Sequence, residues 1–102
     1  MPDYDLVLIG GGPGGYATAL RAAQLGLRVA VVEREFLGGV CLNIGCIPSK
    51  TLLRNAEIAD LLRQGAEFGF SFENLKLDYE TAYRRSRRVS DQLTRGVQFL
   101  MR

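Results

Sequence analysis

The stretch "YDLVLIGGGPGGYATALRAAQLGLRVAVVE", residues 4–33, decides the fold of this chain. It opens with an apolar run, residues 4–10, that ends in glycines, which is typical of a strand buried on both faces. An alanine- and leucine-rich segment, residues 16–26, predicts a helix that stops at Gly26. A second apolar and β-branched run, residues 27–33, predicts another strand. Strand, helix and strand within about thirty residues predict a βαβ unit.

Three glycines, Gly10, Gly12 and Gly15, spell G-x-G-x-x-G between the first predicted strand and the helix. In this place Gly10 permits a tight turn, Gly12 lets the backbone approach a pyrophosphate, and Gly15 lets helix and strand pack closely. The phosphates would meet unpaired N–H groups and the positive end of the helix dipole. The loop therefore predicts dinucleotide binding.

Glu33 ends the second predicted strand, eighteen residues after Gly15. An acid at this place can accept hydrogen bonds from the hydroxyls of an adenosine ribose, and its charge disfavours a 2′-phosphate. A simpler interpretation is the polar end of a strand beside Arg34. The spacing alone does not separate FAD from NAD.

The rest of the chain predicts loops and two more helices. Residues 34–48 are loop-like and glycine-rich, and a helix is expected from about Ile47 to near Gly65, with Pro48 in its first turn. Residues 68–78 are irregular, with at most a short strand and a turn. Residues 78–102 predict a long amphipathic helix that Asp78 caps. Its apolar face is expected to hold Ala82, Val89, Leu93, Val97 and Leu100.

Length and composition set the broad class. With 102 residues, 47% hydrophobic and 24% charged residues and a net charge of +2, the chain has the size and composition of one small globular domain. No apolar run reaches the length of a membrane span, and the N-terminus lacks the basic segment of a signal peptide. We therefore expect a cytoplasmic protein, in a compartment where lasting structural disulfides are rare.

Both cysteines lie in "GGVCLNIGCIPSK", residues 38–50, and the chain contains no histidine. Two thiolates without histidine fall short of a closed zinc site, so we expect no metal. A disulfide between Cys41 and Cys46 would close a very small loop, so it would stabilise the folded protein by only about 2 kcal/mol. A redox role explains more, because the helix dipole and Lys50 favour a thiolate at Cys46. Two inert buried thiols remain the alternative.

The segment "GGVCLNIGCIPSKTLL" resembles the redox-active disulfide of the flavin-dependent pyridine nucleotide–disulfide oxidoreductases. Residues 9–33 resemble the FAD-binding start of that family, and residues 89–101 resemble a later helix, so the likeness covers the whole chain. Glutathione and mercuric reductases share the C-x4-C frame. The particular residues of "CLNIGCIPSK", with Leu42, Ile47 and Ser49, favour the branch of the family that oxidises dihydrolipoyl groups.

The resemblance implies a role for each residue of the site. Cys41 would exchange with the substrate dithiol, Cys46 would lie against the flavin and pass electrons to it, and Lys50 would stabilise negative charge on the reduced ring. The residues that the resemblance places at a tightly but non-covalently bound FAD are Gly10, Gly12 and Gly15 at the pyrophosphate, Glu33 at the ribose, and Gly38, Gly39, Cys46 and Lys50 at the flavin.

The family also implies a reaction and a fold. Dihydrolipoyl group and NAD⁺ would give lipoyl group and NADH, with a lipoyl domain of a 2-oxo acid dehydrogenase complex as partner and a homodimer as the whole enzyme. The fold class is α/β: a Rossmann-like FAD-binding βαβ unit, then a redox-disulfide helix and a long amphipathic helix, in an incomplete domain. Residues 1–102 would be the N-terminal part of the FAD-binding domain, with the NAD-binding, central and interface domains absent and no turnover by this chain alone.

Two other classes of function compete with this one. A free-standing flavin or redox module would work at this length. Nucleic-acid binding is suggested by "RRSRR", residues 84–88, but no recognised binding motif accompanies these arginines. We interpret them as a solvated helix face and expect neither a nucleic-acid nor a membrane partner.

Overall fold

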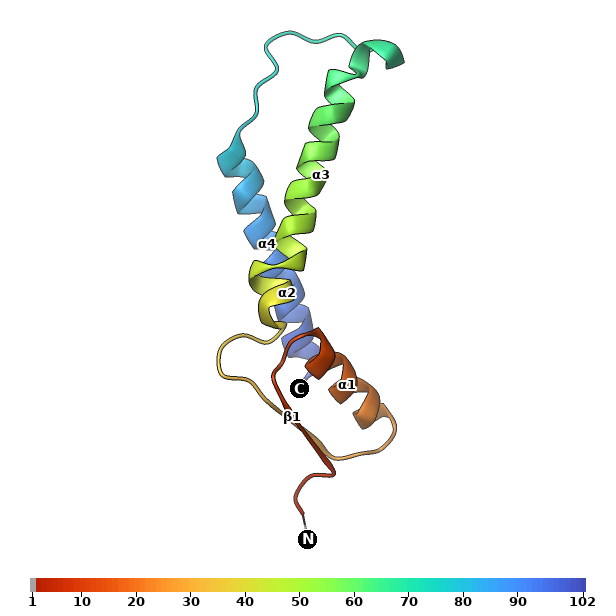
Figure 1. Cartoon of the computed structure of the whole chain (residues 1–102), viewed down its shortest axis with the longest axis vertical. Coiled ribbons are helices and arrows are strands. Elements are labelled where there is room, and N and C mark those ends of the chain that lie inside the picture. Colours follow the sequence, from red (N-terminus) through yellow and green to blue (C-terminus); the bar gives the residue numbers. More distant parts are fainter. Residues whose placement is uncertain (1) are drawn as a thin grey trace.

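A computed structural model describes residues 2–102. The elements follow in the order β1 (Leu6–Ile9), α1 (Pro13–Gln24), β2 (Val29–Val32), α2 (Gly39–Ile44), α3 (Cys46–Arg63), the 3₁₀ helix η1 (Gly65–Phe68) and α4 (Tyr79–Leu100). The strands and α1 form a small unit at one end, and α3 rises away from it (Figure 1). Helix α4 runs back along α3 and α2 and ends beside that unit (Figure 1).

The predicted βαβ unit is confirmed. Strands β1 and β2 pair in parallel, with Leu6 opposite Val29 and Ile9 opposite Val32. Both are shorter than the predicted runs, residues 4–10 and 27–33. At their start, the Asp5 carboxylate binds the backbone N–H of Arg28 at 2.8 Å and its guanidinium at 2.9 Å, which closes the sheet there.

Helix α1 begins earlier than predicted, at Pro13 and not at Tyr16. Proline suits the first helical position because it has no N–H to leave unpaired and its φ is already helical. The predicted stop is confirmed: Gly26 has a φ of 85°, and the N–H of Leu27 bonds to the carbonyl of Ala22 at 3.1 Å.

The expectation of a loop over residues 34–48 is wrong in its second half. Helix α2 occupies Gly39–Ile44, and α3 begins at Cys46, one residue before the predicted start at Ile47. Gly45, with φ −130° and ψ −111°, separates the two helices. Gly39 enters α2 with a φ of 61°, a left-handed conformation that glycine adopts without strain. A short helix flanked by glycines has too few residues to show a helical period in the sequence.

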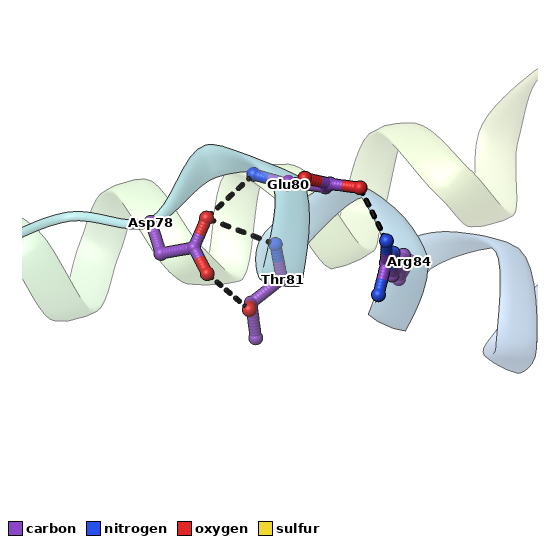
Figure 2. A network of polar contacts seen from close by, with 4 residues as sticks. All are labelled: Asp78, Glu80, Thr81 and Arg84. Carbon is purple, nitrogen blue, oxygen red and sulfur yellow. Dashed lines mark hydrogen bonds and ion pairs between the residues drawn. The ribbon is translucent and has the colours of Figure 1, made fainter.

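The segment between α3 and α4 contains η1 and otherwise irregular backbone, with no strand over residues 68–78. The predicted cap of α4 is confirmed, because the Asp78 carboxylate accepts from the N–H of Glu80 at 3.1 Å and of Thr81 at 3.4 Å. Figure 2 shows these bonds and the ion pair between Glu80 and Arg84 one turn later.

The apolar face predicted for α4 is only partly right. Ala82 and Val97 are buried, but Leu93 and Leu100 are 42% and 58% exposed. The buried stripe continues through Ser86 and Ser90. Small side chains at a helix contact allow the two axes to approach, so these serines let α4 lie close to α2 and α3.

The molecule is elongated. Its extents are 70 × 24 × 17 Å and its radius of gyration is 19.7 Å, whereas a compact domain of this length has about 13 Å. On β1 and β2, Val7, Ile9 and Val32 remain 53%, 92% and 56% exposed. Within residues 2–102, none of the helices combines the length and the hydropathy that a membrane crossing requires.

Candidate functional site

The glycine loop lies between the end of β1 and the start of α1, as predicted. Gly10 turns out of the strand with a φ of 105°. A Cβ at Gly15 would lie 1.9 Å from the carbonyl oxygen of Gly10, so only glycine allows this approach. A Cβ at Gly12 would meet nothing nearer than the Cα of Gly39, at 3.9 Å. The first bond of the helix runs from the N–H of Tyr16 to the carbonyl of Gly12 at 2.9 Å, so the N–H groups of Gly14 and Gly15 have no acceptor within the helix and remain for an anion.

Glu33 reaches back to this loop from the end of β2. Its carboxylate accepts from the N–H of Gly11 at 2.7 Å and from the N–H of Glu35 at 2.9 Å. The bonds from Glu35 and from Gly11, in that order, lower the pKa of the Glu33 carboxyl below its ordinary value. The side chain is half-buried. Because a carboxylate has about four lone-pair positions, it can still accept from a ligand hydroxyl.

The glycine pair before α2 is attached to the same loop. The N–H of Gly38 donates to the carbonyl of Gly11 at 2.7 Å. A Cβ at Gly39 would lie 2.8 Å from the Cα of Gly12, so the two backbones touch. The structure therefore brings the glycine loop and the start of the cysteine segment together.

The two cysteines form a disulfide that joins α2 to α3. Their Cα atoms are 4.5 Å apart. Cys41 is half-buried in α2, and Cys46, the first residue of α3, is exposed. Lys50 is also exposed and follows Cys46 by four residues, which places it about one turn further along the same face.

Glu33 and α2 border a common hollow. A cavity of about 220 Å³ is lined by Glu33, Gly39, Val40 and Asn43, among others. The acid predicted to bind a ribose and the helix that carries Cys41 are thus neighbours around one opening.

Asn43, which sequence reasoning did not single out, is the centre of a hydrogen-bond network in the cysteine segment. Its side-chain amide donates to the carbonyls of Leu37 at 3.1 Å and Gly39 at 2.9 Å. Its side-chain oxygen accepts from the hydroxyl of Thr94 at 3.0 Å, and its backbone carbonyl accepts from Arg87. The one available signal was its place between the two cysteines, since both partners on α4 are distant in the sequence.

The arginine run on α4 has partners within the chain. Arg84 pairs with Glu80, Arg87 donates to Asn43, and Arg85 donates to the backbone carbonyl of Thr51 at 3.5 Å. The contacts of Arg85 and Arg87 connect α4 to α3 and α2, whereas the pair between Arg84 and Glu80 lies within α4. Over residues 2–102, no group of three or more potential metal ligands comes together.

Comparison with known proteins gives a consistent result. The family model described as "Pyridine nucleotide-disulphide oxidoreductase" matches residues 4–102. The curated proteins named "Dihydrolipoyl dehydrogenase" from Mycobacterium tuberculosis, Corynebacterium glutamicum and Bacillus subtilis are 55%, 53% and 51% identical over 100%, 97% and 98% of this chain. The chain spans 22%, 21% and 21% of their lengths, about a fifth of each.

Proposed function

The chain belongs to the pyridine nucleotide-disulphide oxidoreductase family, and we propose that it is the N-terminal part of the FAD-binding domain of a dihydrolipoyl dehydrogenase. The observation that carries this proposal is the Cys41–Cys46 disulfide, attached to a dinucleotide-type glycine loop by the bond from Gly38 to Gly11. A redox pair and a loop of this kind in one site suit the transfer of electrons from a dithiol to a bound dinucleotide. Two curated relatives that match nearly the whole chain carry the name of the dihydrolipoyl enzyme.

The residues of the loop fit FAD. The space before Gly12 and the free N–H groups at the start of α1 suit a pyrophosphate, and the contact between Gly15 and Gly10 holds the helix against the strand. We assign Glu33 to the ribose of the adenosine half. Gly38 and Gly39 are assigned to the flavin side, where they leave room for a flat ring. When bound, FAD supplies the acceptor for the two electrons that the cysteine pair releases.

The cysteines carry the exchange with substrate. A thiolate of the dihydrolipoyl group attacks the Sγ of Cys41, the Cys41–Cys46 bond breaks, and Cys46 leaves as a thiolate. The second substrate thiolate then attacks the substrate sulfur of the mixed disulfide and releases Cys41. The lipoyl group is oxidised to its disulfide, and the cysteine pair is reduced by the two electrons of the substrate dithiol. The protons that the substrate thiols lose when they ionise pass to solvent, from which the cysteine thiolates take up protons.

Cys46 and Lys50 favour the charged form of this dithiol. Cys46 is at the N-terminus of an 18-residue helix, where the dipole stabilises a thiolate. Lys50 adds a positive charge one turn later. We therefore assign the flavin-facing position to Cys46 and the substrate-facing position to Cys41.

In this proposal the other functions of the enzyme belong to segments other than residues 1–102. The exposed face of the sheet at Val7, Ile9 and Val32 and the elongated shape support a domain whose further segments cover this surface. We assign NAD⁺ binding, the homodimer interface and the docking of a lipoyl domain to those segments, and we place the enzyme in the cytoplasm.

The test uses the full-length protein without oxygen. Dihydrolipoamide should bleach the flavin absorbance, and Cys41→Ser and Cys46→Ser should abolish that bleaching while flavin stays bound. Ser90→Ala, which changes a buried residue of α4 whose hydroxyl has no hydrogen bond to the cysteine segment, should bleach like the wild type. Bleaching that survives in Cys41→Ser would refute the exchange role. Equal efficiency with glutathione would point to a different disulfide reductase.

A further inference from the structure

We propose that Asn43 is a positioning residue that fastens the redox segment to α4 through Thr94 and Arg87, and so sets the reduction potential of the Cys41–Cys46 disulfide. The inference rests on the proposed redox function of the two cysteines. It adds a task for α4, a helix to which neither the dinucleotide motif nor the cysteine motif assigns one.

Asn43 uses both ends of its side chain. Its Nδ2 donates to the carbonyls of Leu37 and Gly39, at 3.1 and 2.9 Å, which holds the entry to α2 in place. Its Oδ1 accepts from the Thr94 hydroxyl at 3.0 Å, across a sequence separation of 51 residues. One side chain therefore connects the chain before Cys41 to α4.

Arg87 adds a second connection on the same residue. It donates to the backbone carbonyl of Asn43, in the last turn of α2. Carbonyls in the last turn of a helix have no partner within it, and a cation there is favourable because of the helix dipole. Arg87 and Thr94 are seven residues apart, two turns of α4, so they hold Asn43 from one face of the helix.

The structure shows these bonds in the disulfide form, and reduction of the cysteines should weaken them. In the disulfide form the Cα atoms of Cys41 and Cys46 are 4.5 Å apart, near the short end of the usual range. Reduction replaces the bond by two sulfurs that must separate, and Asn43 lies on the backbone between them. The network is formed in the closed arrangement, so it opposes that separation and stabilises the disulfide relative to the dithiol.

The reaction to be measured is protein disulfide plus two glutathione thiols giving protein dithiol plus glutathione disulfide. It is followed in the full-length protein by trapping thiols and analysing the peptide that contains Cys41 and Cys46 by mass spectrometry. Thr94→Val, which removes the hydroxyl and keeps the shape, should shift the equilibrium about fivefold toward the dithiol, the size expected for one net hydrogen bond. Arg87→Gln should shift it in the same direction.

Three controls separate positioning from general stability. Thr94→Ser keeps the hydroxyl and should restore most of the wild-type equilibrium. Ser90→Ala, on the same helix but with no hydrogen bond to the segment, should leave it unchanged. In concentrated urea the hydrogen-bond network is absent, so all variants should have the same thiol–disulfide equilibrium constant.

A residue with only a structural role would lower the stability of the oxidised and reduced proteins equally and leave this equilibrium at the wild-type value. That result for both Thr94→Val and Arg87→Gln, with helix content retained by circular dichroism, overturns the proposal, as does an equal shift in Ser90→Ala. If Thr94→Val loses its helix content, Arg87→Gln decides the question. The equilibrium requires neither flavin reduction nor turnover, so this proposal can fail while the proposed function stands.

Discussion

At Gly15 the absence of one side chain sets the distance between α1 and β1. The site of a Cβ there lies 1.9 Å from the backbone oxygen of Gly10, and backbone cannot move aside as a flexible side chain can. At Gly14, the neighbouring position in the same helix turn, nothing lies within 4 Å of the added atom. The two glycines therefore form a matched pair for testing the loop.

Gly15→Ala should destabilise the protein by about 3 kcal/mol, the upper part of the range for overpacking, and should lower the amount of FAD that the full-length protein retains. Gly14→Ala should be neutral or slightly stabilising, since alanine is the better helix former. Urea unfolding and the ratio of flavin to protein absorbance measure the two effects. Equal stability of the two variants would show that the close contact at Gly15 is not needed.

Glu33 makes the stability of the loop dependent on pH. Its pKa in the folded protein lies below the ordinary value of 4.5 because Glu35 and Gly11 donate to its carboxylate. A carboxyl of this kind contributes stability that is fully present above its unfolded pKa and is lost as the pH falls through the lower folded pKa.

Glu33→Gln should therefore have a lower urea midpoint than the wild type at pH 7, and the difference should shrink as the pH falls below 4.5. Urea unfolding curves of both proteins, recorded from neutral to acid pH, measure this difference in midpoint. Glu73→Gln, in the segment between η1 and α4, is the control and should run parallel to the wild type. A difference between Glu33→Gln and the wild type that does not change with pH would contradict the assignment to this carboxyl.

At the scale of elements, α4 is the helix that holds α2 and α3 together. Its buried stripe includes two serines. Ser86 is 1% exposed and Ser90 is 0% exposed. The Ser86 hydroxyl donates to the carbonyl of Tyr83 at 2.6 Å, whereas the Ser90 hydroxyl has no hydrogen-bond partner among residues 2–102. A buried polar group without a partner lowers stability.

Ser90→Ala should raise the stability of the protein by about 1 kcal/mol, because it removes this unpaired hydroxyl and improves helix propensity. Ser86→Ala should raise the stability by less, because it also removes the hydrogen bond from Ser86 to Tyr83. Urea unfolding of both variants measures the difference. An equal gain in the two would assign the effect to helix propensity alone.

For the molecule as a whole, the hairpin of α3 and α4 extends far from the βαβ unit (Figure 1). Its far end carries an apolar cavity of about 360 Å³ lined by Ile58, Leu61, Leu62, Gly65, Phe68, Phe70 and Phe72. Phe68 and Phe70 are 63% and 69% exposed, and the sheet is uncovered at Ile9. Apolar surface of this extent favours association.

The isolated chain of 102 residues should therefore be marginally stable or self-associate at micromolar concentration, since short parallel strands need cover on both faces. Light scattering and sedimentation over a tenfold range of concentration measure the association. Phe68→Ser combined with Phe70→Ser should reduce it, and Glu73→Gln serves as the control. A monomer with a cooperative melt at ordinary temperature would contradict this prediction.

Local patterns in the sequence predicted much of the fold and of the site. The βαβ unit, the stop at Gly26, the Asp78 cap and the family followed from residues adjacent in the chain. The errors fell where a local signal was short or ambiguous: α2 lacks a helical period, and the buried face of α4 follows its serines and leaves Leu93 and Leu100 exposed.

The sequence by itself determined the βαβ unit, the two long helices, the glycine loop and the placing of both cysteines in one short segment, because hydrophobic periodicity, glycine spacing and cysteine spacing act over a few residues. Only the tertiary structure decided which groups meet: Glu33 with Gly11, Gly39 with Gly12, and Asn43 with Thr94. Such contacts depend on how the helices cross and how far the backbone bends between them. A position 51 residues away gives no local signal of its partner.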